Sequence, residues 1–253
     1  MQKYNSIFAY AAQRILPKLS LLLAVTAAVE ISLFKVVLHK YAEQGIYNFT
    51  LNDVIDEGHI TLVFGLSAAC MYALLCGICS AKGSNRMRYT LYRLPLSERF
   101  LPWIWMLCNV FVIMIFWAFQ LGLLLILSRI FMHEPHIASS YLGVFLAAYE
   151  VPVFHSLLPL DDIWLHIENI ILIISAAVSA SLFALKQLHG RFNFAAPLLA
   201  VCTFVSFSRS ATGSFVSGAK LFMLAACIVI ELYSLVIMIH DCRHGFREVY
   251  ENA

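Results

Sequence analysis

The chain has 253 residues, of which 61% are hydrophobic and 13% are charged, and its mean hydropathy is +0.81. A water-soluble domain of this length could not bury so large an apolar fraction, so the composition excludes a soluble enzyme. It indicates an all-α integral membrane protein with one membrane domain, residues 1–253. The formal net charge of +2 comes with no basic tail or face, so we expect no nucleic-acid partner.

The first residues predict an amphipathic helix over 4–16. Apolar side chains recur at Tyr4, Phe8, Ala11 and Ile15, which is helical spacing along one face. Pro17 is expected to end this helix. We interpret it as a helix that lies on the cytoplasmic membrane surface before the first span, and the alternative is the start of that span itself.

Six apolar runs follow that could each cross about 30 Å of hydrocarbon. They lie near 19–38, 59–80, 101–128, 163–185, 193–208 and 216–240, and the fifth is the shortest. A seventh piece, Ile137–Tyr149, is too short to cross comfortably and is bracketed by Pro135 and Pro152. We therefore expect the connection 129–162 to be external and partly re-entrant.

The distribution of basic residues predicts that both termini are cytoplasmic. With six spans, twelve of the seventeen Lys and Arg residues lie on the inner side and five lie at or near the outer side. If residues 137–149 also crossed, the split would become eight against nine. The loop 82–100 alone supplies five of the inner ones: Lys82, Arg86, Arg88, Arg93 and Arg99.

No pattern for catalysis, cofactor or metal binding stands out. The run Gly213–Lys220 approaches a phosphate-binding loop, but Leu221 replaces the Ser or Thr that would hold magnesium. His133 and His136 are read as loop histidines in preference to a metal site. The seven cysteines are expected to be free thiols, with Cys76 and Cys79 as packing residues.

Four charged residues within the predicted spans are selected as candidates for function. Glu231 lies deep in the last one, where a charge costs roughly 2.5–3.5 kcal/mol. It is expected either on a pathway or subunit interface, or as a protonated carboxyl bonded to a neighbouring helix. Glu30, Lys35 and Glu168 lie near outer ends and are expected to reach the headgroups by snorkelling, with a possible role at an external mouth.

The fourth run contains small side chains at four-residue spacing, from Ser175 to Ser181. Such a face lets helix backbones approach closely. We expect it to pack inside the bundle, and the alternative is a seam between two subunits.

The loop 82–100 also carries the sequence Tyr-Thr-Leu-Tyr-Arg-Leu-Pro-Leu-Ser-Glu, from Tyr89 to Glu98. With the six runs, this resembles the membrane (permease) subunit of ABC transporters of the type-2, exporter-like class. Members typically carry a Leu-Pro-Leu/Val-Ser element just ahead of the third span. The chain departs from their commoner pattern, since its long outer segment follows the third span and residues 209–215 form a short connection.

The resemblance implies that this chain is not an enzyme and binds no cofactor itself. A separate ATP-binding subunit would bind ATP and magnesium, and a second copy or a related permease would complete the transporter in a bacterial plasma membrane. Its cargo would be an exported amphipathic or peptide-like compound. The residues implied to dock on the ATP-binding subunit are Tyr92, Arg93, Leu94, Ser97, Glu98, Arg99 and Phe100.

Other interpretations stay open at this point. The basic loop could simply anchor to anionic lipid. The chain could also be the substrate-capturing membrane subunit of a vitamin-type importer, or an intramembrane enzyme.

Overall fold

The computed structural model describes residues 2–45, 49–77, 101–133, 143–160, 163–188 and 217–244, and within these ranges the regular structure is helical. The helices are α1 (Gln2–Gln44), α2 (Leu51–Glu57), α3 (Ile60–Gly77), α5 (Leu101–Met132), α6 (Val144–Tyr149), α7 (Pro152–Leu157), α8 (Ile163–Leu188) and α10 (Ser217–His244).

Five of the six predicted spans coincide with long helices. Four stretches in the described part of the chain are long and apolar enough to cross a membrane: Ala12–Gln44, Ile60–Gly77, Pro102–Met132 and Ile163–Gln187. The last helix, α10, has 28 residues with a shorter apolar stretch at Ile228–His240. The predicted span 193–208 and the tip of the one at 59–80 lie outside the described residues.

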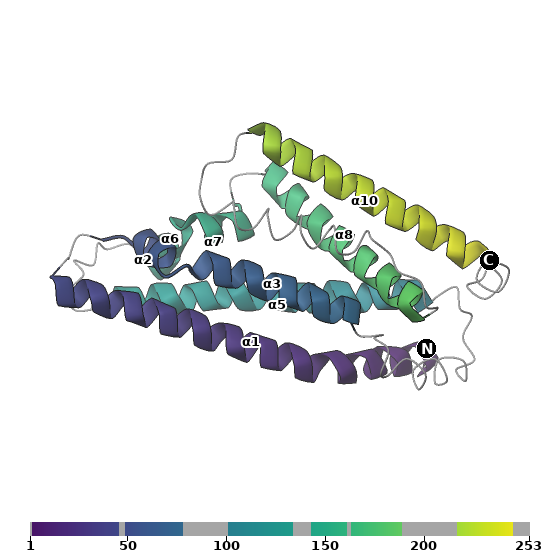
Figure 1. Ribbon diagram of the computed structural model, residues 1–253, viewed down its shortest axis with the longest axis horizontal. Helices are drawn as coiled ribbons and strands as arrows, with labels where there is room; N and C mark the ends of the chain where they lie inside the picture. The colour runs from purple at the N-terminus through teal and green to yellow at the C-terminus, as the bar shows by residue number, and fades with distance from the viewer. Residues whose placement is uncertain are drawn as a thin grey trace.

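The long helices form one bundle in which α8 holds a central place. Helices α1, α3 and α5 lie side by side, α8 packs on α5 and α3, and α10 packs on α8 (Figure 1). The first turn of α1 and the last turn of α10 lie at the same end of the molecule, and α8 and α10 run in the same direction (Figure 1). Short helices α2, α6 and α7 gather at the opposite end.

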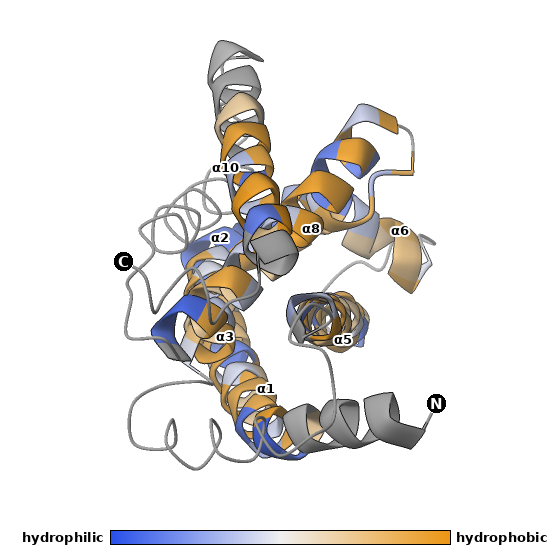
Figure 2. Cartoon of the chain, turned by 90° about the vertical axis from the view of Figure 1, so that its right-hand side faces the viewer, coloured by the Kyte–Doolittle hydropathy of each residue, from blue (hydrophilic) through white to orange (hydrophobic). Residues whose placement is uncertain are grey.

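Hydrophobic residues dominate the long helices (Figure 2), and many large apolar side chains are exposed on the outside of the bundle. Exposed large hydrophobic residues include Leu21 and Val36 on α1, Phe111 on α5, and Val229 and Val236 on α10. Water-soluble proteins rarely leave such continuous apolar faces uncovered, whereas lipid tails would cover them. The described helices therefore fit a protein embedded in a membrane.

The prediction of a separate helix over 4–16 that ends at Pro17 is wrong. One helix, α1, runs from Gln2 to Gln44 with Pro17 inside it. Proline removes a single backbone hydrogen bond, and Ile15 and Leu19 are both buried in the core on either side of it. Packing on both sides thus maintains the helix, and the Ser20 hydroxyl donates to the Pro17 carbonyl at 3.0 Å.

The first connection contains a short helix, α2, that the sequence analysis did not anticipate. Thr50 and Asp53 form a capping box: the Asp53 amide donates to the Thr50 hydroxyl, and the Thr50 amide donates to the Asp53 carboxylate at 2.8 Å. Lys40 of α1 donates a hydrogen bond to Glu57, which lowers the pKa of that carboxyl. The capped helix and this ion pair tie the end of α1 to the start of α3.

The connection after α5 folds back onto the bundle through α6 and α7. The Ser128 hydroxyl donates to the Val144 carbonyl at 2.9 Å, and the Asn169 amide donates to the Ser156 carbonyl at 2.9 Å. Phe154 is buried and meets the rings of Phe145 and Tyr149 edge to face. Of the predicted interfacial piece 137–149, residues 137–142 lie outside the described residues, and α6 itself is only six residues long.

The substitution Thr50→Ala should loosen α2 without disturbing the long helices. It removes the acceptor for the Asp53 amide, at a cost of about 1 kcal/mol. Hydrogen–deuterium exchange in peptides covering 50–57 should become faster, while Thr50→Ser, which keeps the hydroxyl, should exchange like the natural protein. Unchanged exchange in Thr50→Ala would contradict the assigned cap.

Candidate functional site

The seven residues implied to dock on an ATP-binding subunit, Tyr92, Arg93, Leu94, Ser97, Glu98, Arg99 and Phe100, all lie outside the described residues. That docking assignment stays a prediction. Several polar side chains that the structure does place lie inside the bundle, between pairs of the long helices.

Glu30 is the most deeply buried of the ionisable residues selected from the sequence. Its exposed fraction is 0%, and it lies between α1 and α5, where the amide nitrogen of Gln120 donates to its two carboxyl oxygens at 2.9 and 3.0 Å. The prediction that Glu30 snorkels to the headgroups is therefore wrong. Gln120, 90 positions away on α5, supplies the hydrogen bonds that water would supply to a snorkelling carboxyl.

Lys35 and Glu168 are less buried than Glu30. Lys35 is exposed on α1, as snorkelling requires, and Glu168 is half-buried near the start of α8. The grouping of Glu30, Lys35 and Glu168 at an external mouth stays a prediction, although Glu30 itself faces α5 and Lys35 is exposed.

Glu231 of α10 is half-buried and contacts a neighbouring helix. The Ser175 hydroxyl of α8 donates to its Oε2 at 3.0 Å. This contact matches the interpretation of Glu231 as a carboxyl bonded to an adjacent helix. It joins α8 to α10, which pack against each other.

The small-residue face of α8 is buried inside the bundle, as expected. Ser175, Ala177, Ser179 and Ser181 have no exposed surface. The alternative of a seam between two subunits is wrong for this face, because α3, α5 and α10 of the same chain already cover it.

Two further polar residues bind the face of α8 and were not selected from the sequence. The hydroxyls of Tyr72 and Ser179 lie 2.7 Å apart, and since Ser179 donates to the Ala176 carbonyl, Tyr72 is the donor of this pair. The Asn109 amide donates to the Ala177 carbonyl at 3.3 Å. An isolated polar residue in an apolar helix is the signal that could have identified Asn109, and the same signal marks Gln120.

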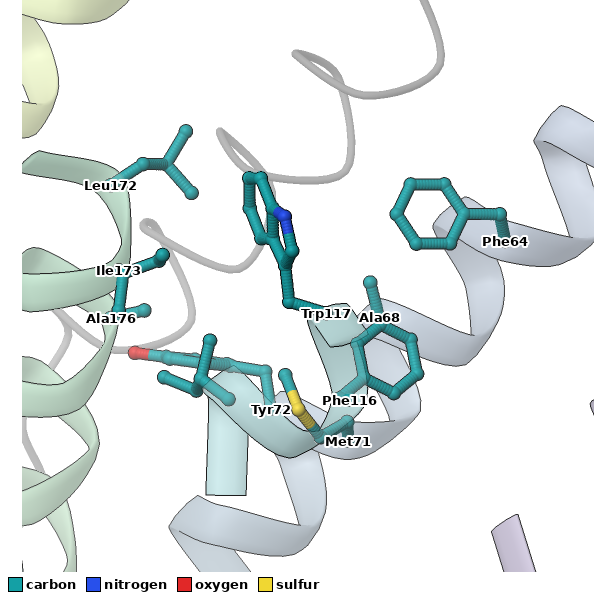
Figure 3. A pocket seen from close by; sticks show the side chains of 10 residues that line it. Phe64, Ala68, Met71, Tyr72, Phe116, Trp117, Leu172, Ile173 and Ala176 are labelled. Carbon is teal, nitrogen blue, oxygen red and sulfur yellow. The ribbon is translucent and has the colours of Figure 1, made fainter. Parts of the chain in front are cut away.

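A small apolar cavity lies between α3, α5 and α8. Its volume is about 40 Å³, and Trp117 stands in it between Phe64 of α3 and Leu172 of α8 (Figure 3). Phe64 stacks on Phe116 with ring centres 6.0 Å apart, and the Tyr72 hydroxyl points toward α8 (Figure 3). The side chains that line it are apolar apart from the hydroxyl of Tyr72 and the indole N–H of Trp117, so the cavity offers few groups that could orient a polar ligand.

Reactive or metal-binding groups do not converge in the described ranges. No group of three or more His, Cys, Asp or Glu side chains is close enough to hold a metal ion there. Cys70, Cys76 and Cys108 are free thiols, as predicted.

Comparison with known protein families, with curated proteins and with solved structures finds no match for this chain. Its function is therefore argued from its own residues.

The contribution of the hydrogen bond between Tyr72 and Ser179 to stability can be distinguished from the contribution of burial by substituting two serines of α8. Ser179→Ala removes a hydrogen bond between helices, whereas Ser181→Ala removes one that stays within α8, to the Val178 carbonyl. Both hydroxyls are fully buried. Ser179→Ala should therefore lower the free energy of unfolding by about 0.6 kcal/mol more than Ser181→Ala does, and this difference should be at most about 1.7 kcal/mol. Unfolding in detergent mixtures measures this difference, and equal losses would contradict the assignment.

Proposed function

We propose that the chain is the permease subunit of an ATP-driven transporter of the ABC type, energised by a separate ATP-binding subunit. In this proposal it has six spans with both termini in the cytoplasm of a bacterial cell. The single observation that carries the proposal is the basic loop 82–100 with its Arg-Leu-Pro-Leu-Ser-Glu core, residues 93–98, placed between two membrane-spanning segments.

The arrangement of the described helices supports this proposal. The loop joins the end of α3 to the start of α5, and both lie toward the end of the bundle that holds the first turn of α1 and the last turn of α10 (Figure 1). The loop, the first turn of α1 and the last turn of α10 would then all face the cytoplasm, where an ATP-binding subunit is found. The common direction of α8 and α10 agrees with one more crossing between them, the predicted span 193–208.

The contacts of α3 and α5 suggest how force would reach the bundle. Both helices pack against α1 and against α8, and α8 in turn packs against α10. A pull by closing ATP-binding subunits on residues 92–100, the proposed docking helix, would move α3 and α5 together. Their movement against α1 and α8 would switch the bundle between inward-facing and outward-facing states.

The partner subunits follow from the same proposal. A second copy of this chain or a related permease would complete the transporter. Since the small-residue face of α8 is occupied within the chain, the partner would use another surface, such as the exposed apolar side chains of α1 or α10. Export of an amphipathic or peptide-like compound follows from the family resemblance.

Charge reversal in the loop tests the docking assignment. The double substitution Arg93→Glu and Arg99→Glu should abolish co-purification of a nucleotide-binding protein in mild detergent, because each arginine would lose an acidic partner. Mass spectrometry of the purified complex identifies the partner and its ratio to the permease. Retention of the partner at the natural ratio would contradict the assigned docking helix.

A matched control uses arginines of the same loop outside the docking element. Arg86→Glu and Arg88→Glu together change the charge of the loop by the same amount, yet should leave the partner bound. Loss of the partner in both double variants would indicate general lipid anchoring by the loop. If no ATP-binding protein co-purifies with the natural chain after cross-linking in its native membrane, the proposed function is wrong.

A further inference from the structure

Glu30 and Gln120 form an isolated polar pair in the seam between α1 and α5. Both side chains have no exposed surface. The Gln120 amide nitrogen donates to Glu30, yet the amide oxygen of Gln120 is buried without any hydrogen-bond partner. One acceptor in the seam is therefore unsatisfied.

No cationic side chain is placed to neutralise Glu30 among the described residues of the helices that pack on α1. Helix α3 contains no Asp, Glu, Lys, Arg or His, and the charged residue of α5, Arg129, is exposed and lies nine positions beyond Gln120. Lys35 is five positions beyond Glu30 on α1 and is exposed. The remaining ionisable groups of these elements are Lys3, Tyr4, Tyr10, Arg14, Lys18, His39, Lys40, Tyr41 and Glu43 on α1, Asp53, Asp56 and Glu57 on α2, Cys70, Tyr72 and Cys76 on α3, and Cys108 on α5.

The unsatisfied acceptor is explained if Glu30 carries a proton. An ionised carboxylate can only accept hydrogen bonds, so it leaves the Gln120 oxygen without a donor. A carboxylic acid and a primary amide instead form two complementary bonds, in which the acid O–H donates to the amide oxygen and the amide N–H donates to the acid carbonyl. A small rotation of the Gln120 amide, with its nitrogen kept on one carboxyl oxygen, completes this pair.

We propose that Glu30, paired with Gln120, is a proton-binding site within the membrane bundle that is occupied at neutral pH. The neutral pair removes the cost of a buried charge and gives the Gln120 amide oxygen a donor. Loss of the proton would leave a carboxylate with one donor in an apolar seam. Release of the proton therefore requires water to enter, or α1 and α5 to move apart.

The proton thus favours the closed seam between α1 and α5. Any change that separates these helices exposes Glu30 and allows it to release the proton, and closure takes a proton up again. This coupling goes beyond the proposed transport function and does not depend on it, because it follows from the contacts of this chain alone.

Infrared spectroscopy of the purified chain in lipid nanodiscs tests the site. At neutral pH the natural protein should show the carbonyl absorption of a protonated carboxyl in an apolar environment. Glu30→Gln, which keeps the shape of the side chain, should lose this absorption, whereas Glu43→Gln, at an exposed position of α1, should keep it. The same absorption in the protonated-carboxyl region for the natural protein and Glu30→Gln would overturn the proposal, because a carboxylate or a cation-bound carboxylate contributes no band there.

A second variant keeps Glu30 and changes only its partner. Gln120→Leu should retain the absorption but shift it to higher wavenumber, because the acid O–H loses its acceptor. This variant also covers the case in which Glu30→Gln fails to fold. An unshifted band would show that the proton is held elsewhere, and loss of the band in Glu231→Gln or in Glu168→Gln would identify its source.

Discussion

Close approach of α8 to three other helices is the contact on which the rest of the bundle depends. Lipid tails are as apolar as the side chains of the helices, so burial of apolar surface gives little drive for association in a membrane. Alanine and serine on α8 let the backbones come near enough for dispersion contacts and for side-chain hydrogen bonds. Tyr72, Asn109 and Glu231 each bring such a bond from a different helix, α3, α5 and α10. The bundle is thus held by short polar contacts along one face of small residues.

The positions of the long helices could be predicted from the sequence because length and hydropathy are local properties. The runs at 101–128 and 163–185 match α5 and α8 within a few residues. The small-residue face of α8 was assigned to the interior of the bundle for a similar reason, since its spacing is visible in one segment. A contact of Glu231 with a neighbouring helix could be expected from the sequence, although Ser175 could not be named as its partner.

The depth of Glu30 could not be predicted because it depends on Gln120, which is far away in the chain. Position along a helix sets how far a side chain is from the membrane surface, but it does not tell which face meets another helix. Continuation of α1 through Pro17 has a similar origin, since Ile15 and Leu19 pack on other helices at either side. The Thr50 and Asp53 pattern that caps α2 was local and could have been recognised.

The length of α1 has a mechanical consequence. At 1.5 Å per residue, its 43 residues extend about 65 Å, whereas a bilayer with its headgroups is about 40–45 Å thick. A helix of that length either tilts strongly or projects beyond the membrane as a continuous rod. Because Glu30 lies well inside it, a small rotation about that point would produce a larger displacement at both ends. A small rotation of α1 about its contact with Gln120 would therefore displace α2, to which Lys40 attaches the end of α1.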